Sequence, residues 1–279
     1  MAEISASEVV KLRELTGAGM MDCKKALTET QGDLQKAVDL LRKKGAATAA
    51  KKSINKASEG VIAQYIASGG RLGVLVEVNC QTDFVARNEG FRAFSEEVAV
   101  KVAADPNVNL DAEREAAIAR IRENIQVSRR MRMEVSGNGL IGGYIHTGAK
   151  VGVLVEVGAG QEATVASDDF KQLVRDITLQ IAAASPTTVS RDQLAPAFIA
   201  KEREIAEAQV KGKPPQVIAS IVKGKMEKLY QSFCLVDQGF VKDPDKTVKG
   251  YVESVASKLG DAIVIRRFVR YQVGEVPLV

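Results

Sequence analysis

Residues 60–78, GVIAQYIASGGRLGVLVEV, recur with variation at residues 139–157 as GLIGGYIHTGAKVGVLVEV, at a constant offset of 79. The two segments are identical at 11 of 19 positions, which indicates an internal duplication. In each copy a short apolar stretch ends in Tyr-Ile, a turn with glycine follows, and a second apolar stretch completes the pattern of a β-hairpin. The duplication therefore predicts two related antiparallel units within one chain.

An amphipathic helix is expected after each hairpin. Large apolar residues follow each copy at steps of three or four, and the two sets are again 79 residues apart. The sets are Phe91, Phe94, Val98 and Val102, and Phe170, Leu173, Ile177 and Ile181. Alternating stretches at 125–135 and 263–273, each with an Arg-Arg pair, predict a third strand for each half. The predicted fold class is α+β, with each half a three-stranded antiparallel sheet covered by helices.

Residues 1–45 have the pattern of three short helices that pack as a small bundle. Ser5 or Ser7 could cap the first helix, and Asp22 could cap the second. Residues 46–58 are rich in Ala and Lys and poor in large apolar groups, which is typical of a linker or of a solvated helix.

Met20 and Met21 fall in the loop predicted after Gly19, where at most one of them can easily point inward. Methionine is a soft side chain that suits partner surfaces. The alternative is that one methionine fills the bundle and the other is half-exposed. The local pattern is compatible with both interpretations.

The rest of the chain is predicted to divide into a first core repeat, 59–137, and a second core repeat, 138–279. Within the second repeat, residues 196–211 and 215–231 have helical patterning and face each other across a Gly-Lys-Pro turn. They predict an antiparallel helical hairpin inserted at about 190–231. A protruding hairpin often serves as an interaction arm, although simple self-packing is the commoner explanation.

The composition excludes several classes of function. The chain has 279 residues, 46% of them apolar, and a net charge of +4, far below that of a dedicated nucleic-acid-binding protein. One histidine, His146, excludes sites with several imidazole ligands, and three cysteines without a CxxC pair suggest no zinc knuckle, disulfide framework or redox pair. No GxxxxGK[ST] run could bind a nucleotide directly. Because neither a leader nor an apolar run of ~20 residues is recognisable, we expect a cytoplasmic protein that uses no membrane. The sequence predicts no metal site and no cofactor.

The two copies diverge directly after the hairpin. The first continues NCQTDFV at 79–85, whereas the second continues with a segment at 158–163 that has no aromatic residue and could be a plain solvated loop. A large apolar side chain beside a carboxylate could insert into a partner while the acid meets a cation or an N–H group. Spacing alone instead favours Phe84 packing back on its own helix, with Asp83 as a turn or capping acid. His146, beside the turn of the second hairpin, is interpreted as at most a contact residue.

The segments LRELTGAGMMDCKKAL at 12–27 and EVNCQTDFV at 77–85 strongly resemble the bacterial translation elongation factor Ts family, and the resemblance covers nearly the entire chain. It implies a guanine nucleotide exchange factor that binds elongation factor Tu, both GDP-bound and nucleotide-free, and promotes GDP release without covalent chemistry. It also implies that the N-terminal module is similar to a ubiquitin-associated domain and docks on the partner. The helical hairpin supports self-association in some members of this family.

The resemblance further implies which residues act. One segment is similar to the family's intruding loop, which enters the partner near its magnesium and phosphate site. This magnesium-dislocating loop consists of Thr82, Asp83, Phe84 and Val85. The partner-binding positions implied elsewhere are Arg13, Met20, Met21, Lys24 and His146.

Two other classes of function are compatible with parts of the sequence. An RNA-binding accessory protein is suggested by arginines and aromatic residues of the two predicted third strands. These residues are Arg129, Arg130, Arg132, Arg266, Arg267, Phe268, Arg270 and Tyr271. A solvated sheet face explains such a pattern more often. An enzyme has little support, because Gly17 and Gly19 are too few for a dinucleotide fingerprint and follow a helix instead of a strand.

Overall fold

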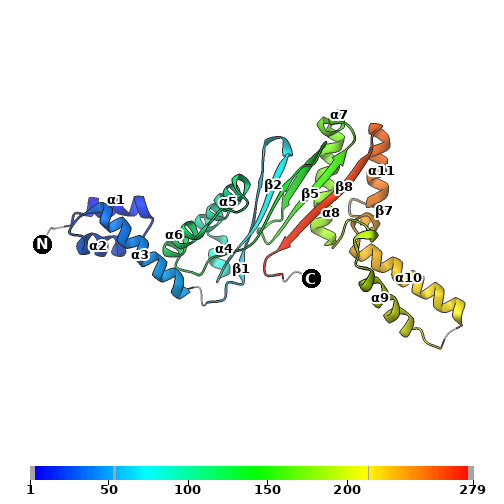
Figure 1. The fold of residues 1–279 in the computed structure, drawn as a ribbon, viewed down its shortest axis with the longest axis horizontal. Helices are drawn as coiled ribbons and strands as arrows, with labels where there is room; N and C mark the ends of the chain where they lie inside the picture. Colours follow the sequence, from blue (N-terminus) through cyan, green and yellow to red (C-terminus); the bar gives the residue numbers. More distant parts are fainter. Residues whose placement is uncertain (1–3, 53–54, 213, 276–279) are drawn as a thin grey trace.

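The computed structural model describes residues 4–52, 55–212 and 214–275. Three parts follow one another along its longest axis, as Figure 1 shows: a small helical module, a central pair of β-sheets flanked by helices, and a helical hairpin that projects away from the sheets. The α+β fold class is confirmed, and both sheets of the duplicated core are antiparallel.

The N-terminal module is a three-helix bundle, as predicted. Ser5 caps the first helix in a reciprocal capping box with Glu8, and Gly17 ends that helix in the left-handed conformation, at φ 65°. The buried centre of the bundle includes Leu12 and Leu27. The helices are α1 (Ala6–Thr16), α2 (Met20–Glu29) and α3 (Leu34–Lys52).

The start of α2 differs from the prediction. Gly19 is the N-cap residue, and Asp22 lies within the first turn instead of capping the helix. Met20 and Met21 therefore begin α2 and do not lie in a loop. A carboxylate in the first turn is still favourable there, because it faces the positive end of the helix dipole.

The predicted linker at 46–58 is helical at its beginning. The third helix does not end at Gly45 but continues to Lys52. Residues 53–54 lie outside the described part of the chain, and the first strand begins at Glu59. Of the two interpretations, linker or helix, the helix is therefore correct for residues 46–52.

The first repeat forms a sheet in the order β1-β2-β3, which confirms the predicted hairpin and third strand. The apolar stripe predicted after the hairpin lies on α5, where Phe91 and Val98 are fully buried against the sheet. The elements are β1 (Glu59–Ile66), β2 (Leu72–Cys80), α4 (Asp83–Arg87), α5 (Glu89–Ala104), α6 (Asp111–Ile121) and β3 (Gln126–Glu134).

The second repeat forms the equivalent sheet in the order β4-β5-β8. Its covering helix, α8, buries Phe170 and Ile177 against the sheet as predicted. The sequence pattern did not predict α11, which packs as a second helix against the same core, or the small two-stranded sheet that precedes it. The elements are β4 (Gly139–Ile145), β5 (Val151–Ala159), α7 (Glu162–Ala166), α8 (Asp168–Ala184), β6 (Gly239–Phe240), β7 (Asp243–Thr247), α11 (Val248–Leu259) and β8 (Ile263–Gln272).

The inserted helical hairpin is confirmed as α9 (Pro196–Ala208) and α10 (Pro215–Phe233). Each helix has proline in its first turn, where the missing N–H costs no hydrogen bond. The two helices bury a small apolar cluster of their own, which includes Val222 and Met226. The hairpin therefore projects as a self-packed arm (Figure 1).

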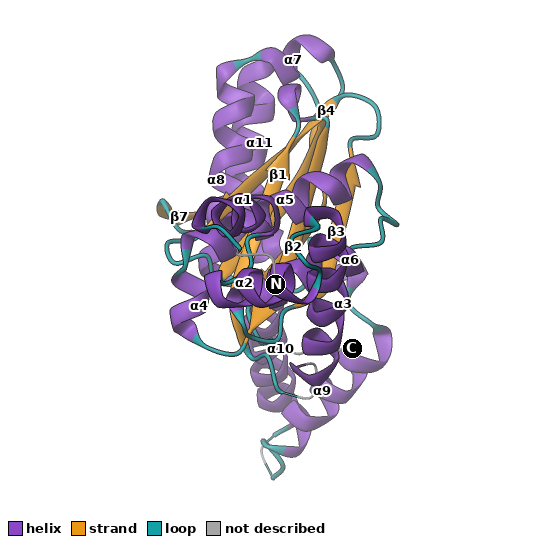
Figure 2. Ribbon diagram, turned by 90° about the vertical axis from the view of Figure 1, so that its left-hand side faces the viewer, coloured by secondary structure: helices purple, strands orange, loops and turns teal. Residues whose placement is uncertain are grey.

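The two sheets pack face to face. Figure 2 shows the strands gathered at the centre of the molecule with helices around them. Two glycines at equivalent positions of the repeat allow this close approach. A Cβ on Gly152 would lie 2.5 Å from Ile62 Cγ2, and one on Gly73 would lie 2.6 Å from Ile141 Cγ2. The buried residues between the sheets are Ile62, Leu75, Met133, Ile141, Leu154 and Tyr271.

Two buried glutamates join the sheets with approximate two-fold symmetry. Glu77 on β2 and Glu156 on β5 occupy the same position of the repeat. Glu77 Oε1 accepts the Gly274 N–H (3.0 Å), from the end of the other sheet's third strand. Glu156 Oε1 accepts the Ser136 N–H (3.1 Å) in the same way. Each carboxylate thus binds the backbone of the opposite half.

Arginines complete each of these sites. Arg129 Nε lies 2.5 Å from Glu77 Oε2, and Arg267 Nε lies 2.7 Å from Glu156 Oε2. Arg266 also contacts Glu156, at 2.9 Å. Burial raises the pKa of Glu156, but hydrogen bonds from the Ser136 N–H and both arginines outweigh it, so the pKa lies below its ordinary value. Glu156 is therefore an ionised cross-link between the two halves, and Glu77 makes the equivalent contacts in the other repeat.

Candidate protein-interaction site

The short helix α4 presents an apolar side chain to solvent. Phe84 is 82% exposed, and no large apolar side chain in the described residues is more exposed. The interpretation that Phe84 packs back on its own helix is therefore wrong. Because exposure of one large apolar side chain costs about 1.5–3 kcal/mol relative to burial, this residue is suited to a partner's pocket.

The other three residues of the predicted loop have different environments. Thr82 is the N-cap of α4, and its Oγ1 accepts the Val85 N–H at 3.3 Å. Val85 is partly buried against the first core. Asp83 does not cap the helix; its carboxylate lies 3.1 Å from Arg87 in a half-exposed ion pair. The segment is thus anchored by its first and last residues, and Asp83 and Phe84 remain accessible.

The chain just before α4 is held by a buried thiol. Cys80 Sγ donates to the Thr82 carbonyl oxygen at 3.2 Å. Burial, together with the nearby charge of Glu123, raises the pKa of Cys80 to about 12, so the thiol stays protonated and can donate. This cysteine is therefore a structural hydrogen-bond donor for the segment that presents Phe84.

The corresponding corner of the second half, the connection from β5 to α8, is not a plain loop, in contrast to the prediction for 158–163. It forms α7, which begins at Glu162. Ala163 stands at the position that matches Phe84, so this copy presents no large apolar side chain there. The duplication therefore supplies the same corner twice and an exposed aromatic residue only once.

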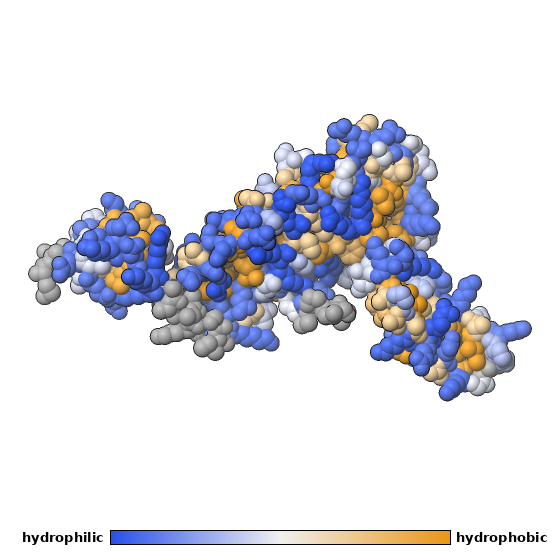
Figure 3. Space-filling view, in the orientation of Figure 1, coloured by the Kyte–Doolittle hydropathy of each residue, from blue (hydrophilic) through white to orange (hydrophobic). Residues whose placement is uncertain are grey.

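The N-terminal module has further exposed apolar side chains, and Figure 3 shows apolar groups among charged ones on the face of the module that it draws. Met20 is 41% exposed and Met21 65% exposed, so neither fills the bundle. Arg13 and Met20 line one groove of about 610 Å³, which is also lined by Arg120 of α6 and by Arg122, directly after that helix. Lys24 is exposed three residues after Met21 and shares its helix face.

His146 lies in the β4–β5 turn and is exposed; its Nδ1 is 2.9 Å from the hydroxyl oxygen of Tyr144. The same turn is tied to the first half, because Lys150 Nζ lies 2.5 Å from Glu59 Oε2. Glu59 pairs with Cys80 at the end of β2, where the segment leading to α4 begins. The structure thus brings the His146 turn and the Phe84 segment to the same end of the paired sheets.

The arginines behind the RNA-binding alternative bind groups of the chain itself. Arg129, Arg266 and Arg267 contact the buried glutamates. Arg130 donates to the Val108 carbonyl and Arg132 to the Ala103 carbonyl, both at 3.0 Å. Arg129 also covers the Tyr271 ring, with its Cζ 4.3 Å from the ring centroid. These arginines are therefore engaged in contacts within the chain, as expected of a structural sheet face.

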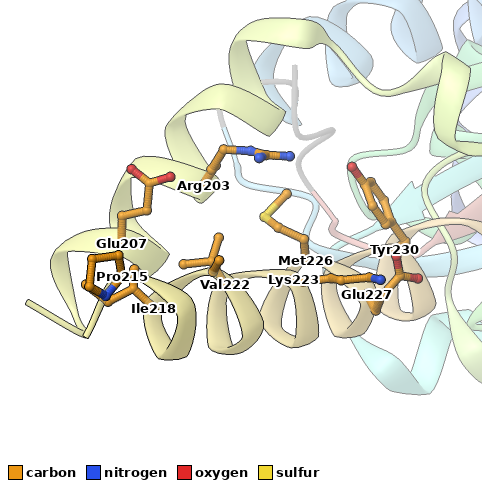
Figure 4. Close-up of a pocket in the computed structure, with 10 residues that line it drawn as sticks. Arg203, Glu207, Pro215, Ile218, Val222, Lys223, Met226, Glu227 and Tyr230 are labelled. Atoms are coloured by element: carbon orange, nitrogen blue, oxygen red, sulfur yellow. The ribbon is translucent and has the colours of Figure 1, made fainter. Parts of the chain in front are cut away.

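The helical hairpin has a groove of its own, of about 670 Å³, between α9 and α10. Figure 4 shows Val222 and Met226 at its centre, with Arg203 above them and Tyr230 at the end nearer the core.

In the described part of the chain, no group of three or more His, Cys, Asp or Glu could hold a metal ion. No helix within the same residues is both long enough and apolar enough to cross a membrane.

Glu123, between α6 and β3, is a site residue that the sequence reading missed. Its carboxylate accepts three hydrogen bonds from the two residues before Asp83. A single acidic residue after a helix does not indicate from the local sequence that it binds a segment about forty residues away. Only the repeat could have indicated it, because Asp261 occupies the equivalent place in the second half and accepts the Gln161 N–H at 2.9 Å.

Comparison with known proteins gives consistent results over nearly the full length. Residues 81–275 match the family model for elongation factor TS. The protein named elongation factor Ts from Symbiobacterium thermophilum is 45% identical to this chain, and the alignment covers 99% of this chain and 93% of that protein. The protein of the same name from Nostoc sp. is 42% identical, with 99% of this chain and 94% of that protein aligned. The protein of the same name from Chloroherpeton thalassium is 42% identical, with 99% of this chain and all of that protein aligned.

Proposed function

This chain belongs to the elongation factor Ts family, and on that premise we propose that it is the guanine nucleotide exchange factor of elongation factor Tu in translation elongation. It acts in the cytoplasm and binds its partner both with GDP and without nucleotide. GDP leaves without covalent chemistry, and the nucleotide is bound by the partner alone.

The observation that carries this proposal is the exposed Phe84 on an anchored helix. We propose that α4 enters the partner beside its magnesium and phosphate site. Magnesium bridges nucleotide phosphates and protein, so displacing its ligands removes a large electrostatic share of GDP affinity. Asp83 can join this step because its exposed pair with Arg87 is weak and easily exchanged.

Thermodynamic reciprocity gives the proposal a quantitative form. If the factor weakens GDP binding by some ratio, GDP weakens binding of the factor by the same ratio. One inserted phenylalanine supplies about 1.5–3 kcal/mol, and each 1.4 kcal/mol corresponds to tenfold in rate. The remaining binding energy comes from contacts by the N-terminal module and the His146 turn, which hold α4 in place.

The test of the function is the dissociation rate of a fluorescent GDP analogue from elongation factor Tu with and without this protein. We expect dissociation to accelerate with protein concentration and to saturate. An unchanged rate at saturating protein would contradict the proposal. RNA binding that weakens steeply with salt, in place of acceleration, would favour the RNA-binding alternative.

The two exposed methionines of α2 are proposed to bind the partner. Replacing Met20 and Met21 together by alanine removes exposed apolar area and should raise the Kd for GDP-bound partner about tenfold, with little effect on the saturated GDP release rate. Titration of the fluorescent-GDP complex measures both quantities. Met131→Ala is the matched control, because Met131 is also exposed but lies on β3, outside the proposed interface. An equal loss in the control would contradict the assignment.

The helical hairpin is proposed to support self-association. Ile205 on α9 and Val217 on α10 are both exposed and would be covered in a dimer. Val217→Glu should then convert a dimer into a monomer in sedimentation equilibrium, because a buried charge without a partner is unfavourable. Val100→Glu, at an exposed position on α5, should leave the mass unchanged. A monomeric wild-type protein at all concentrations would contradict this proposal.

A further inference from the structure

The segment that presents Phe84 is held by one carboxylate from a distant part of the chain. Glu123 Oε2 accepts the N–H groups of Gln81 (2.9 Å) and Thr82 (3.0 Å), and its Oε1 accepts the Thr82 hydroxyl at 2.6 Å. All three donors lie at the entry to α4. Hydrogen bonds to a charged acceptor are stronger than neutral ones, so Glu123 fixes where this helix begins.

Glu123 is itself fixed by its neighbours on both sides. Arg122, which adopts the left-handed conformation at φ 69°, forms an ion pair with Asp22 of the N-terminal module. Asn124 is fully buried, and its amide donates to the Asn55 carbonyl at 2.7 Å. Three consecutive side chains thus bind three different segments, and Figure 1 shows α6, which leads into them, beside α3. The backbone that carries Glu123 is therefore tied to the bundle through Arg122 and to the segment before β1 through Asn124.

We propose that Glu123 is a positioning residue for exchange: it holds α4 so that Phe84 meets the partner in a fixed place while the N-terminal module is docked. This inference rests on the proposed exchange function. Its physical basis is that two surfaces bind one partner together efficiently only when their spacing is held. Glu123 touches neither nucleotide nor magnesium in this scheme and acts only through the orientation of Phe84.

The duplicated half supplies an internal comparison. Asp261 accepts the Gln161 N–H at 2.9 Å, so an acid supports the equivalent corner of both repeats. The corner that Asp261 supports presents Ala163, and Glu123 supports the one that presents Phe84. A purely structural role would make the two acids equivalent. A positioning role makes only Glu123 important for exchange.

The test uses the full-length chain and fluorescent-GDP release from elongation factor Tu. Glu123→Ala should lower the saturated release rate by about 10- to 100-fold and change the half-saturating concentration much less. Glu123→Gln should restore most of the rate, because its amide can accept the two N–H groups and donate to the Thr82 hydroxyl. Asp261→Ala should leave the rate unchanged. Equal losses in Glu123→Ala and Asp261→Ala would overturn the proposal.

A double-mutant cycle distinguishes action through Phe84 from an independent effect. If Glu123 acts by orienting Phe84, Glu123→Ala should not slow release further when Phe84→Ala is already present. Additive losses would overturn the assignment. Amide hydrogen exchange at residues 81–87 measures positioning without any partner: Glu123→Ala should accelerate it and Asp261→Ala should not. Unchanged protection would refute the positioning role. A wild-type protein that does not accelerate GDP release from elongation factor Tu would refute the exchange function instead.

Discussion

Phe84→Ala should lower the saturated rate of GDP release by about 10- to 100-fold, a loss that no other single truncation in this protein is expected to exceed. The substitution removes an apolar group that the free protein exposes to water and that the partner would bury. The affinity for GDP-bound partner should change less, because the proposed insertion of α4 would compete with an occupied phosphate site in that complex. Stopped-flow release of a fluorescent GDP analogue over a range of factor concentrations separates the two quantities.

The stability of the protein provides the control for this prediction. A side chain that is 82% exposed makes few contacts, so Phe84→Ala should change the free energy of unfolding by less than about 0.5 kcal/mol. Val100→Ala, at another exposed apolar position, should change neither stability nor exchange. A wild-type release rate in Phe84→Ala would refute the role assigned to α4.

Glu156→Ala should lower the free energy of unfolding by about 3 kcal/mol, the largest expected effect on stability. The glutamate is 1% exposed, and its loss leaves the Ser136 N–H without this acceptor and two arginines without their carboxylate partner, although both still donate to backbone carbonyls. The arginine side chains remain partly solvated, which limits the penalty. Urea unfolding at neutral pH, followed by circular dichroism, measures this difference.

Two comparisons make this prediction specific. Glu134→Ala removes an exposed partner of Arg132 and should cost less than about 1 kcal/mol. The pKa of folded Glu156 lies below 4.5, so the ionised carboxylate stabilises the fold above about pH 4.5 and loses this effect as the pH falls through the folded value. The stability gap between wild type and Glu156→Ala should therefore narrow in acid. A gap that is independent of pH would contradict the ionic cross-link.

Local pattern was sufficient to predict the two three-stranded sheets and their first covering helices, but not α11, which also packs on the second core. The hairpins, the third strands and the buried faces of α5 and α8 are confirmed, because each depends on a period of two or of three to four residues. The same reasoning failed at boundaries. It placed Met20 and Met21 in a loop, although α2 begins at Met20 without a side-chain cap. It also ended the third helix at Gly45, although a single glycine does not by itself end a helix.

The sequence by itself determined that this protein is a duplicated antiparallel core with two helical attachments, and the motif around Phe84 indicated its family. Only the tertiary structure showed that the two sheets face each other, with Leu75 and Glu77 on the inner face of β2. It also showed that Phe84 points into solvent from a helix entry held by Glu123. Periodicity reports which face of an element is apolar, whereas contacts between residues as distant as Glu77 and Gly274 arise only when the repeats pack together.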